Sequence, residues 1–338
     1  FLVSLPLFYS FIQLSYEMSL KGQIAIVTGA SRGIGQGIAL QLGEAGATVY
    51  LTGRKPEQSD GHRIDGLPSL EQTARDVTDR GGKGIAVYVD HRDMEQVKEF
   101  FARIEKETNG QLDILVNNAY SAVAAVVPAD GKGPQKFYED DPERWDVVNN
   151  VGLRNHYFCS VYASRMMVKN KKGLIINVSS RGGLTYLFSV PYGVGKCAVD
   201  RMAADMAVEL KSDGVTSVSL WPGPVRTQLI LRKMENEDFA KSRLGKVIAD
   251  AETIEYSGKA VVALASDPEK WKVSGRILTT ADLGDKYGFV DVDGRRPLSI
   301  RSAPFALRTL FGYPTLASVI PPWIKIPGWM LAAWYSLL

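Results

Sequence analysis

A tyrosine and a lysine four positions apart, Tyr192 and Lys196 in the run YGVGK, have the residue types needed to move a proton. At helical spacing their side chains lie one turn apart on the same face. A free tyrosine has a pKa near about 10, and a neighbouring ammonium favours the phenolate and lowers that pKa. The pair therefore predicts a general acid and base that works near neutral pH.

Two serines end a strand-like run upstream of this pair. The run GLIINVSS finishes at Ser179 and Ser180, where a hydroxyl can hydrogen-bond a substrate oxygen and hold it against Tyr192. A tyrosine and a lysine at this spacing often occur together by chance. The serine pair and a glycine-rich segment nearer the start of the chain make the pattern specific.

That glycine-rich segment, TGASRGIG at residues 28–35, lies between the apolar run IAIV and an amphipathic helical pattern. Glycines let the backbone approach a ligand, and the free amides and dipole of the helix start attract phosphate groups. Strand, turn and helix together predict a dinucleotide site. The residues expected to contact the cofactor there are Gly29, Ser31, Arg32, Gly33, Ile34 and Gly35.

The identity of the dinucleotide is indicated by the end of the next strand-like run, Thr52-Gly53-Arg54. An NAD enzyme commonly has an acidic residue there to bind the adenosine ribose. Arg54 and Arg32 instead carry guanidinium groups that suit a 2′-phosphate. We therefore expect NADP(H), with NAD(H) less favoured; on the alternative interpretation both arginines are only solvated.

Residues 29–33 also fit the G-x-S-x-G pattern of α/β hydrolases, with Ser31 as nucleophile. Such an enzyme needs a histidine late in the chain, and the last one is His156. The hydrolase is therefore disfavoured. Three histidines and two cysteines without ligand spacing predict no metal site.

Apolar runs rich in Val and Ile alternate with helical patterns from Lys21 onward. Strands that are apolar on both faces belong to a parallel sheet covered by helices on both sides, so we expect an α/β, doubly wound parallel sheet of the Rossmann type. The six expected strands are IAIVTG, TVYLTG, GIAVYVD, LDILVNN, GLIINVSS and VTSVSLWPG. Helices are expected near residues 145–167, 192–210 and 257–264, and residues 121–142, rich in Pro and Gly, as a loop.

The chain has 338 residues, with 40 basic and 37 acidic side chains and no run of five like charges, which argues against a nucleic-acid partner. We expect an apolar extension at 1–20, one catalytic domain at 21–285 and an apolar tail rich in Trp and Pro at 286–338. Two cysteines favour a reducing compartment, and we expect a cytoplasmic protein.

Both extensions have two interpretations. Residues 1–17 precede the first methionine, Met18, and are interpreted as an upstream artefact, with a short membrane anchor as the alternative. In the tail, Trp323, Trp329 and Trp334 suit the headgroup region of a membrane, such as the cytosolic face of the endoplasmic reticulum. Prolines argue against a spanning helix; alternatively the tail packs on a protomer or closes a dimer interface.

Several motifs together resemble the short-chain dehydrogenase/reductase family over residues 21–285: TGASRGIG, NNA at 117–119, the serine pair, YGVGK and PGPVRT at 222–227. The resemblance implies that Tyr192 donates the proton in reduction and that Lys196 modifies its pKa and binds ribose. It implies Ser180, with Ser179 as fallback, as the group that orients the carbonyl.

The resemblance further implies cofactor contacts by Asp90 near the adenine, Asn118 beside the ribose and Thr227 on the nicotinamide side. Two departures matter. Tyr120 stands where the family's NNAG has glycine, and we expect it to line the substrate pocket. The family's helix asparagine falls on Gly152, with Asn149, one turn earlier, or a water as its replacement.

We therefore expect an NADPH-dependent carbonyl reductase or alcohol dehydrogenase that transfers hydride between nicotinamide and an apolar ketone or secondary alcohol, of the steroid or xenobiotic type that the resemblance implies. The alternative is a cofactor-binding regulatory or scaffold protein with weak or no turnover. The expected partners are the apolar carbonyl substrate, a second copy in a homo-oligomer and a membrane surface. Residues 228–256 are expected to form a lid, with an ordinary surface helix as the alternative.

Overall fold

The computed structural model describes residues 18–55, 67–126, 136–309, 313–321 and 323–335. The interpretation of residues 1–17 lies outside these ranges. Seven parallel strands form one sheet in the order β3-β2-β1-β4-β5-β6-β7. The strands are β1 (Ile24–Val27), β2 (Thr48–Gly53), β3 (Lys83–Tyr88), β4 (Ile114–Asn117), β5 (Gly173–Val178), β6 (Val215–Trp221) and β7 (Ile277–Thr279).

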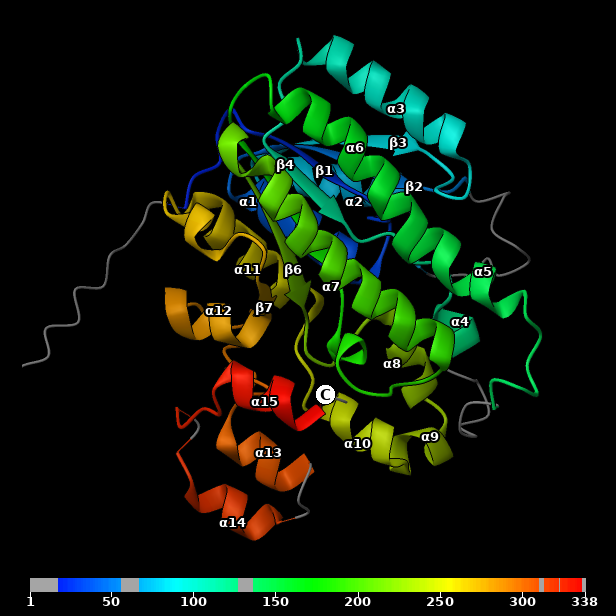
Figure 1. Ribbon diagram of the computed structural model, residues 1–338, viewed down its shortest axis with the longest axis vertical. Coiled ribbons are helices and arrows are strands. Elements are labelled where there is room, and N and C mark those ends of the chain that lie inside the picture. The colour runs from blue at the N-terminus through cyan, green and yellow to red at the C-terminus, as the bar shows by residue number, and fades with distance from the viewer. Residues whose placement is uncertain (1–17, 56–66, 127–135, 310–312, 322, 336–338) are drawn as a thin grey trace, which may run out of the picture.

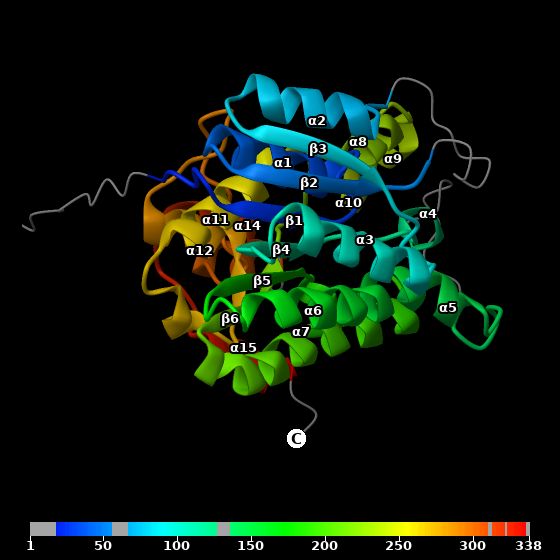
Figure 2. The ribbon, with the colours of Figure 1, turned by 90° about the horizontal axis from the view of Figure 1, so that it is seen from above.

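Helices cover both faces of this sheet, which confirms the expected α/β class (Figure 2). One face packs on α1 (Gly33–Glu44), α2 (Leu70–Asp79) and α11 (Ile254–Ser266). The other packs on α3 (Met94–Glu107), α6 (Asn155–Met167) and α7 (Val190–Leu210). Strands β4, β5 and β6 are buried along their whole length, because both of their faces are covered.

The strand order reverses between β1 and β4, which are neighbours although two strands separate them in the chain. At such a switch point the loops after the two strands diverge and leave a crevice at the carboxyl ends of the strands. Thr28 follows β1, Asn118 follows β4, Ser179 follows β5 and Pro222 follows β6. The segments expected to carry the chemistry thus meet at one edge of the sheet.

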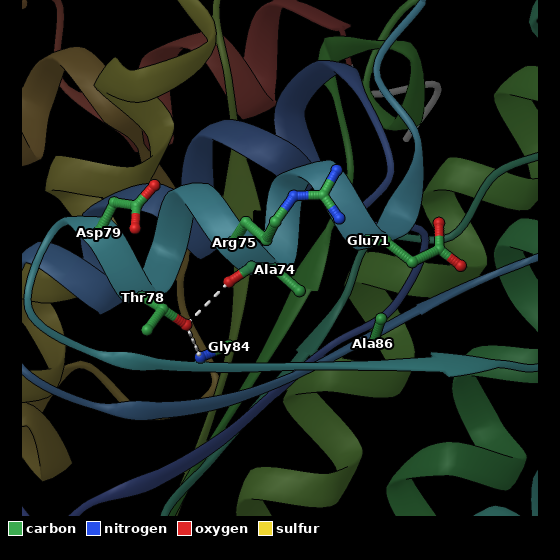
Figure 3. Close-up of a pocket in the computed structure, with 7 residues that line it drawn as sticks. All are labelled: Glu71, Ala74, Arg75, Thr78, Asp79, Gly84 and Ala86. Carbon is green, nitrogen blue, oxygen red and sulfur yellow. Dashed lines mark hydrogen bonds between the residues drawn. The ribbon is translucent and has the colours of Figure 1, made fainter.

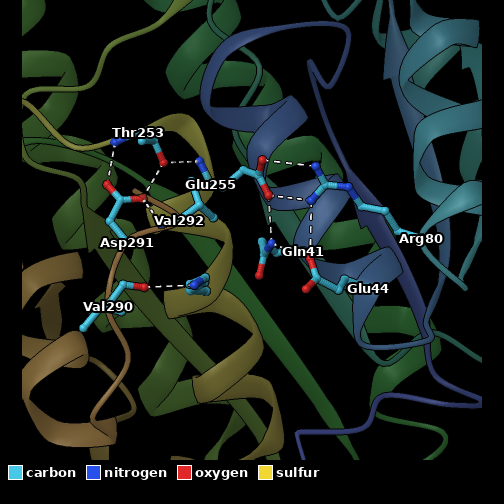
Figure 4. A network of polar contacts seen from close by, with 9 residues as sticks. Gln41, Glu44, Arg80, Thr253, Glu255, Val290, Asp291 and Val292 are labelled. Atoms are coloured by element: carbon cyan, nitrogen blue, oxygen red, sulfur yellow. Dashed lines mark hydrogen bonds and ion pairs between the residues drawn. The ribbon is translucent and has the colours of Figure 1, made fainter. Parts of the chain in front are cut away.

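A polar network fixes α11 against the helix that follows the glycine-rich turn (Figure 4). Glu255 on α11 pairs with Arg80 at 2.5 Å and accepts a hydrogen bond from Gln41 of α1 at 2.8 Å. The backbones of α1 and α11 approach closely, since a Cβ at Gly37 would lie 2.0 Å from the Ile254 carbonyl oxygen. The start of α1 therefore has a rigid support behind it.

The helix expected at 145–167 is interrupted, which corrects that prediction. It consists of α5 (Arg144–Asn149), a π-helical segment (Asn150–Arg154) and α6. Within the π segment Gly152 has φ +135°, a backbone conformation that glycine adopts readily. The prediction that residues 121–142 are a loop is wrong in part, because Val123–Val126 form a single helical turn, α4.

After β6 the chain forms three short helices, α8 (Gln228–Met234), α9 (Glu237–Lys241) and α10 (Arg243–Ala249). The sequence patterns did not predict β7 or the helix after it, α12 (Thr280–Tyr287). Short 3-10 turns lie at Arg181–Gly183, Lys211–Asp213 and Lys270–Val273.

The tail forms α13 (Ala303–Thr309), α14 (Pro314–Val319) and α15 (Gly328–Tyr335), gathered beside α12 at one end of the molecule (Figure 1). Lys325 pairs with Asp282 at 2.6 Å and with Asp285 at 2.7 Å, and Arg301 pairs with Asp282 at 3.2 Å. These ion pairs attach the tail to α12. None of the helices described here is long and apolar enough to cross a membrane.

Candidate active site

Ser180 and Tyr192 lie in hydrogen-bond contact, with 2.8 Å between their hydroxyl oxygens. Helix α7 begins directly before Tyr192 because Ser189 caps it, accepting a hydrogen bond from the Tyr192 amide, and Pro191 occupies its first turn. Ser180 follows β5 and accepts from the Gly182 amide at 3.1 Å, which starts a 3-10 turn. The strand end and the helix start thus bring the two hydroxyls together.

Lys196 lies one turn along α7 and is buried. Its ammonium donates to the Val178 carbonyl oxygen at 3.1 Å and lies 5.9 Å from the centre of the Tyr192 ring. Burial lowers the pKa of Lys196 to about 8, against the opposing charge of Asp200. A lysine with this pKa changes charge close to neutral pH.

The pKa of Tyr192 differs from the sequence expectation. Burial raises it, the hydrogen bond from Ser180 lowers it, and the charge of Asp200 raises it, so the pKa lies above the ordinary value. The physical reason is that Tyr192 is itself buried and that the Lys196 ammonium is directed at the Val178 carbonyl. The expected lowering by the lysine is therefore not the dominant influence in this structure.

The glycine-rich turn adopts the backbone that such a site requires. Gly29 has φ +67°, and a Cβ there would lie 2.7 Å from the Ala119 Cα. Asn118 holds the turn, because its side-chain amide donates to the carbonyls of Thr28 at 2.9 Å and Gly29 at 3.1 Å. A Cβ at Gly35 would meet this amide at 2.4 Å.

The start of α1 contacts the segment after β6. The Gly33 amide donates to the Gln228 side chain at 2.8 Å, and a Cβ at Gly33 would lie 3.5 Å from the Thr227 methyl. The structure therefore brings Thr227 to the glycine-rich turn. Sequence reasoning missed Gln228, for which the only signal was its position directly after Thr227.

Three charged residues of the expected site lie in the segments that follow the first three strands: Arg32 after β1, Arg54 after β2 and Asp90 after β3. Burial and the charge of Arg54 lower the pKa of Arg32. Asp90 accepts hydrogen bonds from the Arg92 backbone at 2.9 Å and side chain at 2.8 Å. Burial raises the pKa of Asp90, but these hydrogen bonds outweigh it and the pKa lies below the ordinary value. His91, fully buried, lies 2.7 Å from the Thr52 hydroxyl.

A buried glutamate supports the loop that carries Thr227. The Glu252 carboxyl accepts from Thr280 at 2.8 Å and Ser257 at 3.3 Å, and from the Gly223 backbone. Its own amide donates to the Pro224 carbonyl at 3.0 Å. Burial raises the pKa of Glu252 to about 8, so this carboxyl is protonated over much of the neutral range.

A small apolar cluster, separate from the two main cores, packs around Tyr192. Its residues come from distant parts of the sequence, including the segment after β4, the turn before α7 and helices α8 and α9. Tyr120, which the sequence analysis expects to line the substrate pocket, belongs to this cluster. The cluster consists of Tyr120, Ala122, Val126, Val148, Leu187, Phe188, Tyr192, Ile230, Met234 and Phe239.

The contacts of Asn149 with the described residues do not include Lys196. Its side-chain amide donates to the Pro191 carbonyl at 3.3 Å, and a Cβ at Gly195 would lie 2.0 Å from its oxygen. Asn149 therefore fixes the start of α7. The space over Gly152 is filled by the Tyr120 ring, which a Cβ at Gly152 would meet at 2.5 Å.

A shallow pocket of about 290 Å³ lies elsewhere, between α2 and β3 (Figure 3). Thr78 at its base donates to the Ala74 carbonyl and accepts from the Gly84 amide. None of the expected site residues lines it. Among the described residues, no group of His, Cys, Asp and Glu is arranged to hold a metal ion.

A comparison with protein families agrees with the order of the site segments along the chain. These segments are the glycine-rich turn, Asn118, Ser180, Tyr192 and Lys196. Residues 23–238 match the family model described as short chain dehydrogenase. The chain belongs to the short-chain dehydrogenase family. Enzymes of this family are oxidoreductases that use a nicotinamide cofactor and act on small molecules.

Among the short-chain dehydrogenases, dehydrogenase/reductase SDR family member 1 of Mus musculus is 45% identical over 321 residues, covering 94% of this chain and 98% of the relative. The protein of the same name from Homo sapiens is 44% identical with the same coverage. A chloroplastic NADPH-dependent aldehyde reductase 2 of Arabidopsis thaliana is 28% identical, covering 78% of this chain and 94% of the relative.

A solved short-chain dehydrogenase also resembles this structure. The crystal structure of a putative short-chain alcohol dehydrogenase from Sinorhizobium meliloti has a TM-score of 0.64 and 28% sequence identity. The match covers 78% of this chain and 96% of that one.

Proposed function

We propose that this short-chain dehydrogenase is an NADPH-dependent carbonyl reductase or alcohol dehydrogenase, acting on an apolar ketone or secondary alcohol of the steroid or xenobiotic type. The observation that carries the proposal is the 2.8 Å contact between Ser180 and Tyr192, surrounded by an apolar cluster. Two adjacent hydroxyls can both donate to one carbonyl oxygen, while the apolar surroundings exclude water from it.

In the proposed reduction, Ser180 and Tyr192 orient the carbonyl oxygen, and the Tyr192 hydroxyl gives that oxygen its proton. The nicotinamide, when bound, supplies the hydride. A raised Tyr192 pKa keeps the hydroxyl protonated at neutral pH, which suits a proton donor. As the proton leaves, the Lys196 ammonium stabilises the phenolate that forms.

The residues of the glycine-rich turn fit a dinucleotide, because Gly29 and Gly35 leave room for close backbone approach where a Cβ would clash. NADP(H) is favoured over NAD(H) by the two cations, Arg32 and Arg54, and by the similarity to an NADPH-dependent aldehyde reductase of Arabidopsis. The proposed cofactor ligands are Gly29, Ser31, Arg32, Gly33, Ile34, Gly35, Arg54, Asp90, Asn118, Tyr192, Lys196 and Thr227.

The apolar substrate class is supported by the side chains around Tyr192. Ile230, Met234 and Phe239 reach this cluster from α8 and α9, so a substrate that contacts Tyr192 must meet or displace them. We propose that the part of residues 228–256 that forms α8, α9 and α10 is a lid that opens for the substrate, because Glu252 and Glu255, near the end of this range, are held by buried and ion-pair contacts.

The decisive experiment measures NADPH oxidation with a panel of aromatic, quinone and steroid ketones, in the wild type and in Tyr192→Phe. We expect Tyr192→Phe to lose about 100-fold or more of kcat while still binding NADPH, with Tyr157→Phe, an exposed tyrosine on α6, as the matched control. Full activity of Tyr192→Phe would refute the proposed acid. NADPH binding without turnover by the wild type would favour the regulatory or scaffold alternative.

We further propose residues 21–285 as the catalytic domain of a cytoplasmic protein, with 286–338 as an attached segment that contacts a membrane surface. The side chains of Trp323 and Trp329 are 75% and 72% exposed, although indole groups are usually partly buried. The ion pairs of Lys325 and Arg301 with α12 fix the tail segment that carries these two tryptophans.

A homo-oligomer is also proposed. Exposed apolar side chains lie along α7, at Val190, Val194 and Val208, and a second copy is an occupant that would cover such a face.

A further inference from the structure

Tyr120 contacts both members of the proposed proton-transfer pair, although it is neither of them. It follows β4 by three residues. The Lys196 ammonium lies 5.0 Å from the centre of the Tyr120 ring, and the Tyr120 and Tyr192 rings meet edge to face at 6.1 Å and 80°. The Tyr120 hydroxyl is buried and has no hydrogen-bond partner among the described residues. Its ring, rather than its hydroxyl, makes the contacts.

Phe188 holds Tyr192 with a second edge-to-face contact, at 5.2 Å and 82°. Its backbone has φ +62°, and the amide of Ser189 donates to the carbonyl of Leu187 at 2.8 Å across it. Such a tight turn is strained for a bulky residue. A strained conformation persists where the surrounding structure fixes it, and here it brings the Phe188 ring to Tyr192.

Gly152 leaves room for the Tyr120 ring. A Cβ at Gly152 would lie 2.5 Å from the Tyr120 Cδ2 and 3.0 Å from its Cε2. The positive φ of Gly152 adds backbone strain to any substitution. The position of the Tyr120 ring therefore depends on glycine at residue 152.

The Tyr120 ring face is one of few groups that compensate the buried Lys196 ammonium. The Val178 carbonyl from β5 accepts its hydrogen bond, and Asp200 lies one turn further along α7, accepting from Ser219 and Trp221. His156 approaches from α6, but burial lowers the pKa of His156 to about 3, so it is neutral. Tyr192 is neutral as well. A ring face within about 6 Å attracts a cation most strongly where both are desolvated.

We propose that Tyr120 is a positioning residue for proton transfer: its ring face holds the Lys196 ammonium, and its edge contact with Tyr192, together with that of Phe188, fixes the acid. The proposal rests on the proposed reductase function for its kinetic consequence. It assigns no contact between Tyr120 and the reacting atoms.

The kinetic test compares the pH dependence of kcat/KM in the wild type, Tyr120→Leu and Tyr120→Phe. Without the Tyr120 ring the neutral form of Lys196 is favoured, so the pKa of Lys196 falls. We therefore expect the alkaline limb of the kcat/KM profile to lie about one pH unit lower in Tyr120→Leu than in the wild type. Tyr120→Phe keeps the ring, so its alkaline limb should lie at the same pH as that of the wild type. Gly152→Ala, which displaces the ring without removing it, should move the limb in the same direction as Tyr120→Leu.

Trp271→Leu is the matched control, because Trp271 is an exposed aromatic residue in the turn Lys270–Val273, outside the apolar cluster around Tyr192; its profile should equal that of the wild type. NADPH binding, followed by fluorescence, identifies variants that retain the folded cofactor site. Identical alkaline limbs in Tyr120→Leu, Gly152→Ala and the wild type would overturn the inference.

A second test needs no turnover. Urea unfolding midpoints are measured for Tyr120→Leu, Lys196→Met and the double variant, with NADPH absent. We expect Tyr120→Leu to lower the midpoint more when Lys196 is present than in the Lys196→Met background. Equal losses in both backgrounds overturn the proposed contact. If the wild type reduces no carbonyl, the proposed function fails, and this cycle still decides the inference about Tyr120.

Discussion

Burial lowers the pKa of the Arg32 guanidinium, and the neighbouring positive charge of Arg54 lowers it further. Two cations therefore lie near each other where β1 and β2 end. Neighbouring like charges repel each other, and an anion between them relieves the repulsion. A 2′-phosphate is a bidentate partner for a guanidinium group. The arrangement is the strongest support for NADPH as the cofactor.

Cofactor preference should therefore change in Arg54→Asp. We expect kcat/KM for NADPH to fall by about 10- to 100-fold, because one charge-assisted contact is lost and a repulsive one is gained, while kcat/KM for NADH falls less or rises. Steady-state kinetics with both cofactors measures the ratio. Arg201→Asp, on the exposed face of α7, is the control. An unchanged ratio in Arg54→Asp would refute the role of Arg54.

The two serines should have separable effects. Ser180 contacts the Tyr192 hydroxyl, whereas the Ser179 hydroxyl donates to the Lys196 backbone carbonyl at 3.2 Å. We expect each of Ser180→Ala and Ser179→Ala to lower stability by about 1 kcal/mol, because each loses a hydrogen bond. Only Ser180→Ala should also lower kcat by about 10- to 100-fold. Turnover and urea unfolding are measured on both. The reverse ranking in kcat would move the orienting role to Ser179.

Glu252 should make stability depend on pH. Its pKa is about 8 in the folded protein, against an ordinary value of 4.5, so between these values the folded state keeps a proton that the unfolded state has lost. Stability therefore falls as pH rises from about 5 to about 8. We expect Glu252→Gln, measured by urea unfolding at both pH values, to reduce this fall by on the order of a few kcal/mol.

Glu237→Gln, at an exposed position on α9, should leave the pH dependence as in the wild type. Equal falls in the wild type and in Glu252→Gln would show that Glu252 is charged in the folded protein.

Membrane contact by the tail should depend on its exposed tryptophans. We expect the wild type to co-sediment with vesicles of phosphatidylcholine and phosphatidylserine, and Trp323→Ala/Trp329→Ala to lose most of that binding. Both side chains point into solvent, so the double variant leaves the ion pairs with α12 intact. Trp271→Ala is the control. Equal sedimentation of wild type and double variant would end the membrane proposal.

The sheet was predictable because its strands are continuous apolar runs. β1, β2 and β5 lie where IAIV, TVYLTG and GLIINV predict them. β7 escaped prediction because it has three residues, of which only Ile277 and Leu278 are apolar, too short a run to indicate a strand. The interruption at Gly152 was not predictable either, since the Tyr120 ring that packs over it belongs to a segment that joins it only in the folded chain.

The candidate site was predictable where a local pattern defined it. The spacing of Tyr192 and Lys196 and the glycine-rich turn needed only helix geometry and strand ends. The pKa direction of Tyr192 was wrong, because burial is a property of the whole fold. The contact between Tyr120 and Lys196 joins residues 76 positions apart in the sequence, and residue types alone do not reveal such a pair.

The attachment of the tail to α12 sets an order of assembly. Asp282 and Asp285 follow the last strand, β7, so their ion pairs with Lys325 join the tail to an element that comes after the whole sheet in the chain. A chain leaving the ribosome presents every residue of the proposed cofactor site before Trp323 and Trp329, and domains generally fold from the N-terminal side during synthesis. Newly made protein can thus form the proposed catalytic domain in water and acquire the surface with the two tryptophans as its final step.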